Sequence, residues 1–339
     1  MNPVKFGIIG CGYVAQRHAR HIQEHQEAEL IACYDIEAPK SDKLAQEYSC
    51  KSADSLEHFL EQDLDMVNIC TPNGNHHLTA IAALKAGKHC LVEKPMSIKR
   101  VHCEKMLEAS MKANRHLFVV KQNRFNPPVQ AVKKLIVENK LGSIQSVDVN
   151  CFWNRNAQYY AQSEWRGSKD LDGGCLFTQY SHFIDILYYL FGDIEALFGQ
   201  SANFQHQDMI EFEDCGNVLF KFKDSNALGN LSFSISAFKQ NMEGSISIFA
   251  ENATIKIGGQ YLNMIDYQKT DGFDIENLPS SSSANNYGFY QGSMSNHHKV
   301  IHNVVETLKG REEIMTNAME GMKVVEIIEN MYRAMGNGN

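Results

Sequence analysis

The sequence lacks several features that would place it in a special class of protein. No apolar run approaches the roughly 18 residues that a membrane-spanning helix requires. The chain enters a strand-like segment at once, without a charged and then apolar leader, so we expect a cytoplasmic protein with no membrane partner. With 339 residues, 43% of them hydrophobic and 21% charged, it has the composition of a globular protein with room for two domains.

Cysteine pairs and basic runs are also missing. The nine cysteines are scattered with no Cys-x-x-Cys motif, and Cys33, Cys70 and Cys90 fall in expected strands. This usage suits buried, reduced thiols rather than disulfides or zinc ligands. A formal net charge of -8 argues against nucleic acid as a partner, because the overall field would oppose phosphate binding. A small anionic ligand remains compatible, since a few arginines dominate inside a cleft.

The first motif that is present is a glycine-rich turn. Residues 4–9 are typical of a buried strand, and a G-x-G-x-x-A sequence follows, from which a helix should begin at about Tyr13. Gly10 permits the tight turn, Gly12 lets the backbone approach a pyrophosphate, and Ala15 permits close packing of helix on strand. We therefore expect a dinucleotide at the helix N-terminus, held by Gly10, Gly12, Tyr13 and Val14.

Asp35 decides which dinucleotide is expected. It ends a second apolar strand, 30–34, about 20 residues after the glycine-rich turn, where an acid that binds the ribose hydroxyls is found in this motif. A carboxylate at this place repels the additional phosphate of NADP. We therefore predict NAD as the cofactor.

Two kinds of sheet are expected along the chain. From 1 to 122, strands alternate with helices, which predicts an NAD-binding Rossmann domain with a parallel sheet. From 123 to 339, strict alternation such as that of 231–236 predicts a second α/β domain with an open, mainly antiparallel sheet for substrate binding and oligomerisation. Within it, 270–295 has loop composition, and 295–335 is expected to be helical.

Several motifs together resemble one family over the whole chain. They are Gly10-x-Gly12-x-x-Ala15, Thr71-Pro72-Asn73 with His76, Glu93-Lys94-Pro95, and Gly173-Gly174 with His182-x-x-Asp185. They are similar to the marks of the Gfo/Idh/MocA oxidoreductases. The resemblance implies a Rossmann domain joined to an open α/β domain, in a homodimer or homotetramer. It also implies cofactor contacts from Thr71, Asn73, His76, Glu93, Lys94, Asn123, Trp165 and Arg166.

Motifs of the second domain are similar to those of a UDP-sugar subgroup of this family. They include Tyr159-Tyr160, Trp165-Arg166-Gly167-Ser168, Thr178-Gln179-x-Ser181-His182, Glu211-x-Glu213-Asp214, Gly258-Gly259-x-x-x-Asn263 and Asn286-Tyr287-Gly288-x-Tyr290-Gln291-Gly292-Ser293. The resemblance implies NAD-dependent oxidation of carbon 3 of UDP-N-acetylglucosaminuronate in bacterial surface-polysaccharide (O-antigen) synthesis. The implied substrate contacts are Lys94, Tyr159, Tyr160, Arg166, Thr178, Gln179, His182, Asn263 and Tyr287.

The chain departs from the wider family at one position. Many members carry Asp-x-Gly-x-His, whereas this chain has Thr178-x-Tyr180-x-His182. The change puts oxidation of inositol or a simple hexose in doubt. A dehydrogenase or reductase of another sugar or cyclitol remains an alternative, as does a regulator that binds the dinucleotide without turnover.

Oxidation of a secondary alcohol requires a base for the hydroxyl proton. His182, at the start of an apolar helix, is the candidate, and Asp185 either orients it or serves the structure. Lys94 follows a strand at the ligand-binding edge, where its ammonium group stabilises a developing alkoxide. We expect Pro95 to follow a cis peptide bond, as it does in relatives.

Arginines and histidines of less certain role complete the candidates. Arg166 either binds a phosphate or the uronic carboxylate, with Tyr159 and Tyr160 against uridine or sugar, or packs on Trp165 as a structural cation-π pair. His18, His21, His25, His297 and His298 have metal-compatible spacing. Because no carboxylate or cysteine completes a ligand set around them in the sequence, we predict no metal site.

Overall fold

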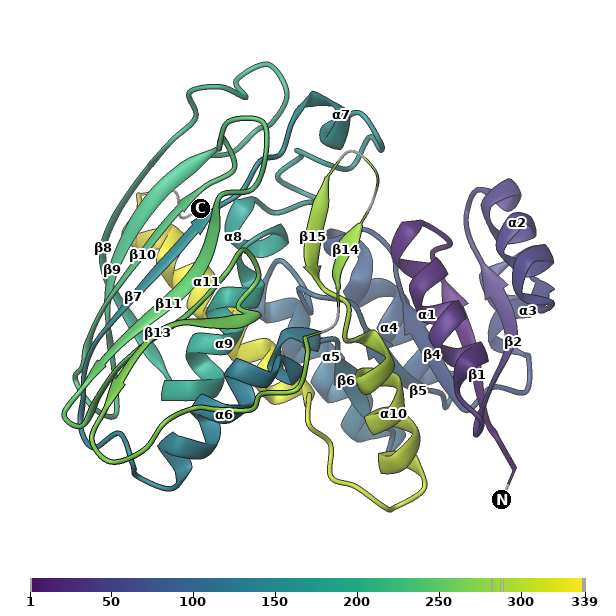
Figure 1. The fold of residues 1–339 in the computed structure, drawn as a ribbon. Helices are drawn as coiled ribbons and strands as arrows, with labels where there is room; N and C mark the ends of the chain where they lie inside the picture. The colour runs from purple at the N-terminus through teal and green to yellow at the C-terminus, as the bar shows by residue number, and fades with distance from the viewer. Residues whose placement is uncertain (1, 282, 287, 289, 337–339) are drawn as a thin grey trace. The chain divides into compact units, whose positions relative to one another are not determined.

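The computed structural model describes residues 2–281, 283–286, 288 and 290–336, which form two compact units (Figure 1). Unit 1 comprises Met1–Lys121 and His297–Val325, and unit 2 comprises Gln122–Asn296 and Glu326–Asn339. The first break is within one residue of the expected boundary. The C-terminal part differs from the expectation of two continuous domains, because 297–325 returns to unit 1.

Unit 1 is built on a parallel sheet of six strands in the order β3-β2-β1-β4-β5-β6. This confirms the predicted Rossmann-type sheet. The order reverses between β1 and β4, the point at which open α/β sheets bind ligands outside the carboxyl ends of the strands. The strands are β1 (Val4–Ile9), β2 (Ala28–Tyr34), β3 (Lys51–Ser52), β4 (Met66–Ile69), β5 (His89–Val92) and β6 (Leu117–Val119).

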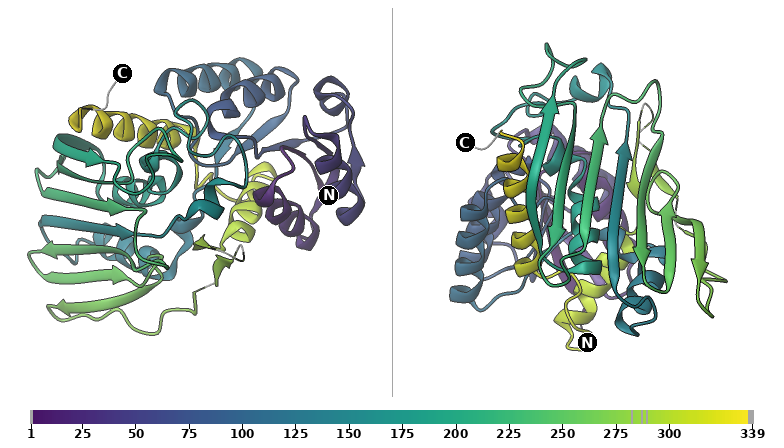
Figure 2. Two further views of the ribbon diagram at one scale, coloured as in Figure 1. Left: turned by 90° about the horizontal axis from the view of Figure 1, so that it is seen from above. Right: turned by 90° about the vertical axis from the view of Figure 1, so that its left-hand side faces the viewer.

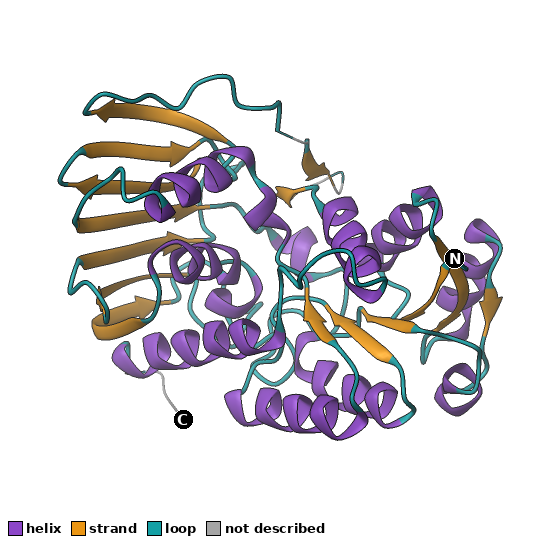
Figure 3. Ribbon diagram, turned by 90° about the horizontal axis from the view of Figure 1, so that it is seen from below, coloured by secondary structure: helices purple, strands orange, loops and turns teal. Residues whose placement is uncertain are grey.

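The helices of unit 1 cover both faces of this sheet (Figure 3). They are α1 (Tyr13–Glu24), α2 (Ala38–Tyr48), α3 (Leu56–Leu60), α4 (His76–Lys85), α5 (Arg100–Ala113) and α10 (His297–Leu308). Helix α1 begins at Tyr13, as predicted. Helix α10 packs along α1 (Figure 2), and the backbone N–H of Val119 in β6 donates to the carbonyl of Thr316 at 2.9 Å. These contacts explain why the late segment belongs to unit 1.

Unit 2 contains a sheet of seven strands in the order β13-β12-β11-β7-β10-β9-β8. Only β7 and β10 pair in parallel within it, so the sheet is mainly antiparallel, as predicted. The strands are β7 (Ile144–Phe152), β8 (Ile194–Ala202), β9 (Cys215–Phe222), β10 (Leu228–Ser234), β11 (Glu243–Ala250), β12 (Ala253–Gly258) and β13 (Met264–Thr270). The helices of unit 2 are α6 (Pro127–Val137), α7 (Ala157–Tyr160), α8 (Cys175–Thr178) and α9 (Ser181–Phe191), and α11 (Ala318–Ala334) begins in unit 1 and ends in unit 2.

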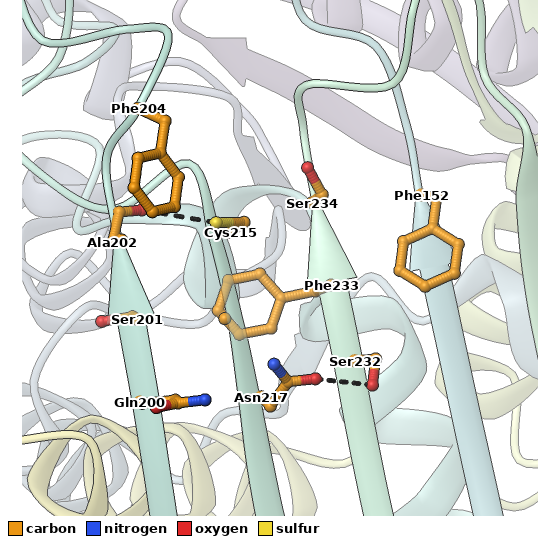
Figure 4. Close-up of a pocket in the computed structure, with 11 residues that line it drawn as sticks. Phe152, Gln200, Ser201, Ala202, Phe204, Cys215, Asn217, Ser232, Phe233 and Ser234 are labelled. Carbon is orange, nitrogen blue, oxygen red and sulfur yellow. Dashed lines mark hydrogen bonds between the residues drawn. The ribbon is translucent and has the colours of Figure 1, made fainter.

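The sheet of unit 2 has one buried and one uncovered face. In β9, Val218, Phe220 and Phe222 are buried, whereas Asn217 and Leu219 are exposed. This alternation confirms the two-faced sheet that the period of two predicted. A cavity of about 530 Å³ lies over β7 to β10 (Figure 4), lined by Phe152, Gln200, Ser201, Ala202, Phe204, Cys215, Gly216, Asn217, Ser232, Phe233 and Ser234. None of the expected site residues lines it.

A short hairpin corrects the reading of 270–295 as loop throughout. Strands β14 (Ala284–Asn286) and β15 (Gln291–Met294) pair antiparallel within this segment. Their polar, glycine-containing sequences lack the alternation that marks a strand, so the backbone pairing had no sequence signal.

Candidate active site

The glycine-rich turn of unit 1 has the shape that a dinucleotide requires. Gly10 has φ of 86°, and a Cβ there would lie 2.7 Å from the backbone of Cys70. A Cβ on Gly12 would meet nothing within 4 Å, so open space lies above the turn. The Asp35 carboxylate accepts the backbone N–H of Cys11 at 2.7 Å, which fixes the acid beside the turn. These residues fit NAD, with its pyrophosphate over the start of α1.

Polar loops after β4 and β5 form the other half of the candidate cofactor site. The ring nitrogens of His76 lie 2.8 Å from the carbonyl oxygens of Thr71 and Pro95, so this side chain ties the two loops together. Burial lowers the pKa of His76, so the neutral ring donates to one carbonyl at a time. The Lys94–Pro95 peptide bond is cis, as expected. The buried Thr71 hydroxyl has no hydrogen-bond partner among the described residues, as expected of a group that awaits a ligand.

Glu93 is buried between two histidines of unit 1. Its Oε1 lies 2.7 Å from His18 Nε2 and 3.6 Å from His297 Nε2. The ligand-type atoms of these three residues all lie within 4.8 Å of one another. The interpretation that no carboxylate accompanies the histidines is therefore wrong for His18 and His297, because folding brings Glu93 to them from β5. The helix-period spacing of the histidines was the only available signal.

The candidate base of unit 2 has a partner that the sequence did not indicate. His182 is buried in the first turn of α9, and its Nε2 lies 3.3 Å from the hydroxyl of Ser293 in β15. The same hydroxyl accepts a hydrogen bond from Gln122 Nε2 at 2.9 Å. The carboxylate of Asp185 accepts hydrogen bonds from Nε and Nη2 of buried Arg124, at 2.9 and 2.7 Å. Asp185 thus forms a buried ion pair with Arg124.

Unit 2 brings several expected substrate residues together. The Arg166 guanidinium lies 4.1 Å from the ring centre of Tyr159 and 5.4 Å from that of Trp165, so the cation-π packing is present. The side-chain amide of Gln179 donates to the Tyr159 hydroxyl at 2.7 Å and accepts from Arg155 Nε at 2.8 Å. Burial raises the pKa of Tyr159 to about 12, so its hydroxyl keeps its proton at neutral pH.

Arg155 was missed from the sequence, although it lies in the centre of this cluster. Its side chain is buried, with 2% of the residue exposed, and its hydrogen bonds go to neutral oxygens of Gln179, Asn154 and Asn241. No carboxylate forms an ion pair with it in the part of the chain that the structure describes. A buried cation without a counter-charge is costly, so this cluster favours an anionic ligand.

The remaining expected residues have varied surroundings. The Thr178 hydroxyl donates to Asp172, another residue that the sequence did not indicate. Asn123 and Asn263 have side-chain oxygens that are buried and lack a hydrogen-bond partner among the described residues. Tyr160 is buried, Val14 is half-buried, and Asn73 is buried. Tyr13 is 59% exposed, and Tyr287 lies outside the described residues.

The expected residues divide between the two units. Lys94 and the glycine-rich turn belong to unit 1, whereas His182, Asn123, Arg166 and the tyrosines belong to unit 2. No helix in the described ranges is both long and apolar enough to span a membrane.

The parallel sheet, the open glycine-rich turn and the anchored acid after β2 define an NAD-binding oxidoreductase with a second α/β domain. The chain belongs to the Gfo/Idh/MocA oxidoreductases. The model of the NAD-binding Rossmann fold of that family matches residues 4–121, and the model of its C-terminal alpha/beta domain matches residues 133–339.

Solved structures of two dehydrogenases are similar to this chain over its whole length. The WlbA dehydrogenase from Bordetella pertussis, in complex with NADH and UDP-GlcNAcA, is 31% identical with a TM-score of 0.89, covering 100% of this chain and 98% of that chain. The WlbA dehydrogenase from Chromobacterium violaceum, with the same ligands, is 32% identical with a TM-score of 0.89, covering 99% and 95%. Glucose-6-phosphate 3-dehydrogenase from Bacillus subtilis is 23% identical, over 98% of this chain and 97% of the relative.

Proposed function

We propose that this NAD-dependent sugar dehydrogenase oxidises the carbon-3 hydroxyl of UDP-N-acetylglucosaminuronate to the 3-keto sugar nucleotide. The observation that carries the substrate is the arginine cluster of unit 2, where buried Arg155 and half-buried Arg166 lie among tyrosines without a carboxylate on Arg155. Diphosphate and uronate groups supply the missing negative charge. Two relatives that are 31% and 32% identical over nearly the whole chain were solved with UDP-GlcNAcA.

The chemistry is divided among a few side chains. NAD bound at the glycine-rich turn and Asp35 supplies the hydride acceptor. His182 takes the hydroxyl proton, and the Ser293 hydroxyl, 3.3 Å from its Nε2, orients the ring. The ammonium group of Lys94 stabilises the alkoxide that forms at carbon 3. Gln179, held between Arg155 and Tyr159, helps to position the sugar.

The proposal extends to the setting of the enzyme. A 3-keto product of this sugar nucleotide suits later modification at carbon 3, which supports a place in bacterial surface-polysaccharide (O-antigen) synthesis. A cytoplasmic location and a homodimer or homotetramer, assembled through the uncovered sheet face of unit 2, remain part of the proposal.

The test mixes the purified protein at near-stoichiometric level with NAD and UDP-N-acetylglucosaminuronate. Reduced-nicotinamide absorbance should rise, and the sugar nucleotide should lose the mass of two hydrogen atoms. High protein concentration allows a single turnover to be seen if the cofactor is held tightly. UDP-N-acetylglucosamine, which lacks the uronic carboxylate, is the matched control. No reduction despite demonstrated NAD binding would reject this substrate and lead to a panel of other sugars and cyclitols.

A further inference from the structure

Glu93 occupies an unusual place for a carboxylate. It is 6% exposed and directly precedes Lys94 at the carboxyl end of β5. Its Oε2 accepts the backbone N–H of Lys94 at 3.1 Å, while Oε1 faces His18 and His297. The carboxylate is thus held by N–H groups from α1, α10 and its own loop.

Hydrogen-bond donors hold this carboxylate. Asn68 Nδ2 lies 3.0 Å from His18 Nδ1, and an amide nitrogen can only donate, so the ring proton of His18 that faces Glu93 is on Nε2. Burial lowers the pKa of His297 to about 4, so this ring is neutral at pH 7. Burial alone would raise the pKa of Glu93, but the bonds from His18 and His297 outweigh it and hold the pKa well below its usual range. Unit 1 therefore keeps Glu93 as a buried, ionised carboxylate.

The location of this charge follows from the sheet. Asp35, after β2, marks the adenosine side of the dinucleotide, and the turn after β1 marks the pyrophosphate. A dinucleotide that continues across the switch point would place its nicotinamide end at the ends of β4 and β5, on the side of Glu93. The nicotinamide ring is positively charged when oxidised and neutral when reduced.

We propose that Glu93 binds the oxidised form of the cofactor in preference to the reduced form, and that His18 and His297 are the positioning residues that hold its carboxylate in place. The inference rests on the proposed position of NAD in unit 1, but not on the identity of the sugar. A charge at this end of the site distinguishes the two redox forms, whereas Asp35, at the adenosine end, meets the same group in both.

The test measures dissociation constants on the full-length protein without any sugar. NADH is titrated by its fluorescence, and NAD by calorimetry, for the wild type and for Glu93→Gln, which keeps the shape and removes the charge. We expect Glu93→Gln to raise the dissociation constant of NAD by a factor about tenfold larger than the factor for NADH. Asp35→Asn is the matched control, and it should raise the dissociation constants of NAD and NADH by the same factor.

Variants of the histidines separate positioning from general stability. His297→Gln and His18→Asn should change the affinity ratio in the same direction as Glu93→Gln, by a smaller factor. These variants also provide the measurement if Glu93→Gln does not fold. Equal weakening of both redox forms by all three variants, or an unchanged ratio, would overturn the proposal. Failure of the wild type to bind either form would instead reject the proposed cofactor site.

Discussion

The hydroxyl of Ser293 lies 3.3 Å from Nε2 of His182, although 111 positions separate them in the sequence. The same hydroxyl accepts from Gln122, and its second lone pair can accept from Nε2–H of His182, which leaves Nδ1 of the ring to take a proton. The pair links the candidate base to the hairpin that the sequence did not predict.

Ser293→Ala should lower kcat about tenfold with little change in KM, because the base loses the group that orients its ring. Steady-state kinetics with UDP-N-acetylglucosaminuronate measures both constants. Ser232→Ala is the matched control, since it removes a comparable hydrogen bond, from Ser232 to Asn217, on the uncovered sheet face. Full activity of His182→Ala with unchanged sugar-nucleotide binding would refute the assignment of the base.

Arg155→Lys should raise KM for the sugar nucleotide by roughly tenfold to a hundredfold, because lysine cannot reproduce the planar guanidinium fork. The dissociation constant for NADH should stay the same. Loss of affinity for both UDP-N-acetylglucosaminuronate and UDP-N-acetylglucosamine would place Arg155 at the diphosphate, and selective loss of the former would place it at the uronate. Unchanged affinity for both sugar nucleotides would contradict the anion site. Arg20→Lys, at an exposed arginine of α1, is the control.

The buried carboxyl of Glu213 should make unit 2 less stable at alkaline pH. Burial raises its pKa from 4.5 to about 7, although the Tyr332 hydroxyl bonded to it opposes the shift. Because the folded-state pKa lies above the unfolded value, its stabilising contribution is complete below pH 4.5 and is lost as pH rises through 7. Glu213→Gln should therefore gain stability over the wild type above pH 7, by up to about 3 kcal/mol.

Urea unfolding at pH 6 and pH 8.5 measures the free energy of unfolding of Glu213→Gln and the wild type. Glu195→Gln, on an exposed edge strand, should leave the pH dependence of the wild type intact. The same change in the free energy of unfolding between the two pH values for Glu213→Gln and the wild type would contradict the prediction.

Histidine pairs should make unit 1 sensitive to acid. His77 stacks on His102 with ring centres 3.7 Å apart, and His89 stacks on His116. Burial lowers the pKa of His89 and His102 to about 4. Since these folded-state values lie below the unfolded value of 6.5, the stability they contribute is present above pH 6.5 and is lost as pH falls toward 4.

Hydrogen exchange at pH 7 and pH 5 should show a larger loss of protection in unit 1 than in unit 2. His102→Gln should reduce this loss. His58 is the control, because its hydrogen bond to the Asp54 carboxylate raises its pKa, so His58→Gln should not protect unit 1 against acid. An equal loss in both units would argue against the histidine pairs as the cause.

Local motifs allowed much of unit 1 to be predicted. The start of α1 at Tyr13, the acid after β2 and the cis bond before Pro95 depend on a few adjacent residues, and the structure has all three. Partners brought in by distant segments could not be predicted. Arg155 looks like an ordinary polar residue in the sequence, and Ser293 is visible only as the end of a motif shared with the UDP-sugar subgroup. Tertiary packing buries the first without a carboxylate and sets the second beside His182.

The return of 297–325 to unit 1 has a consequence for the order of folding. A chain released only as far as residue 121 lacks α10, which packs on α1, and lacks Asn317, which forms a β-bridge with Phe118. During synthesis, the cofactor-binding unit is therefore incomplete until residues 297–325 have left the ribosome. A fragment cut at the end of β6 should bind dinucleotide poorly, even though it contains the complete glycine-rich fingerprint.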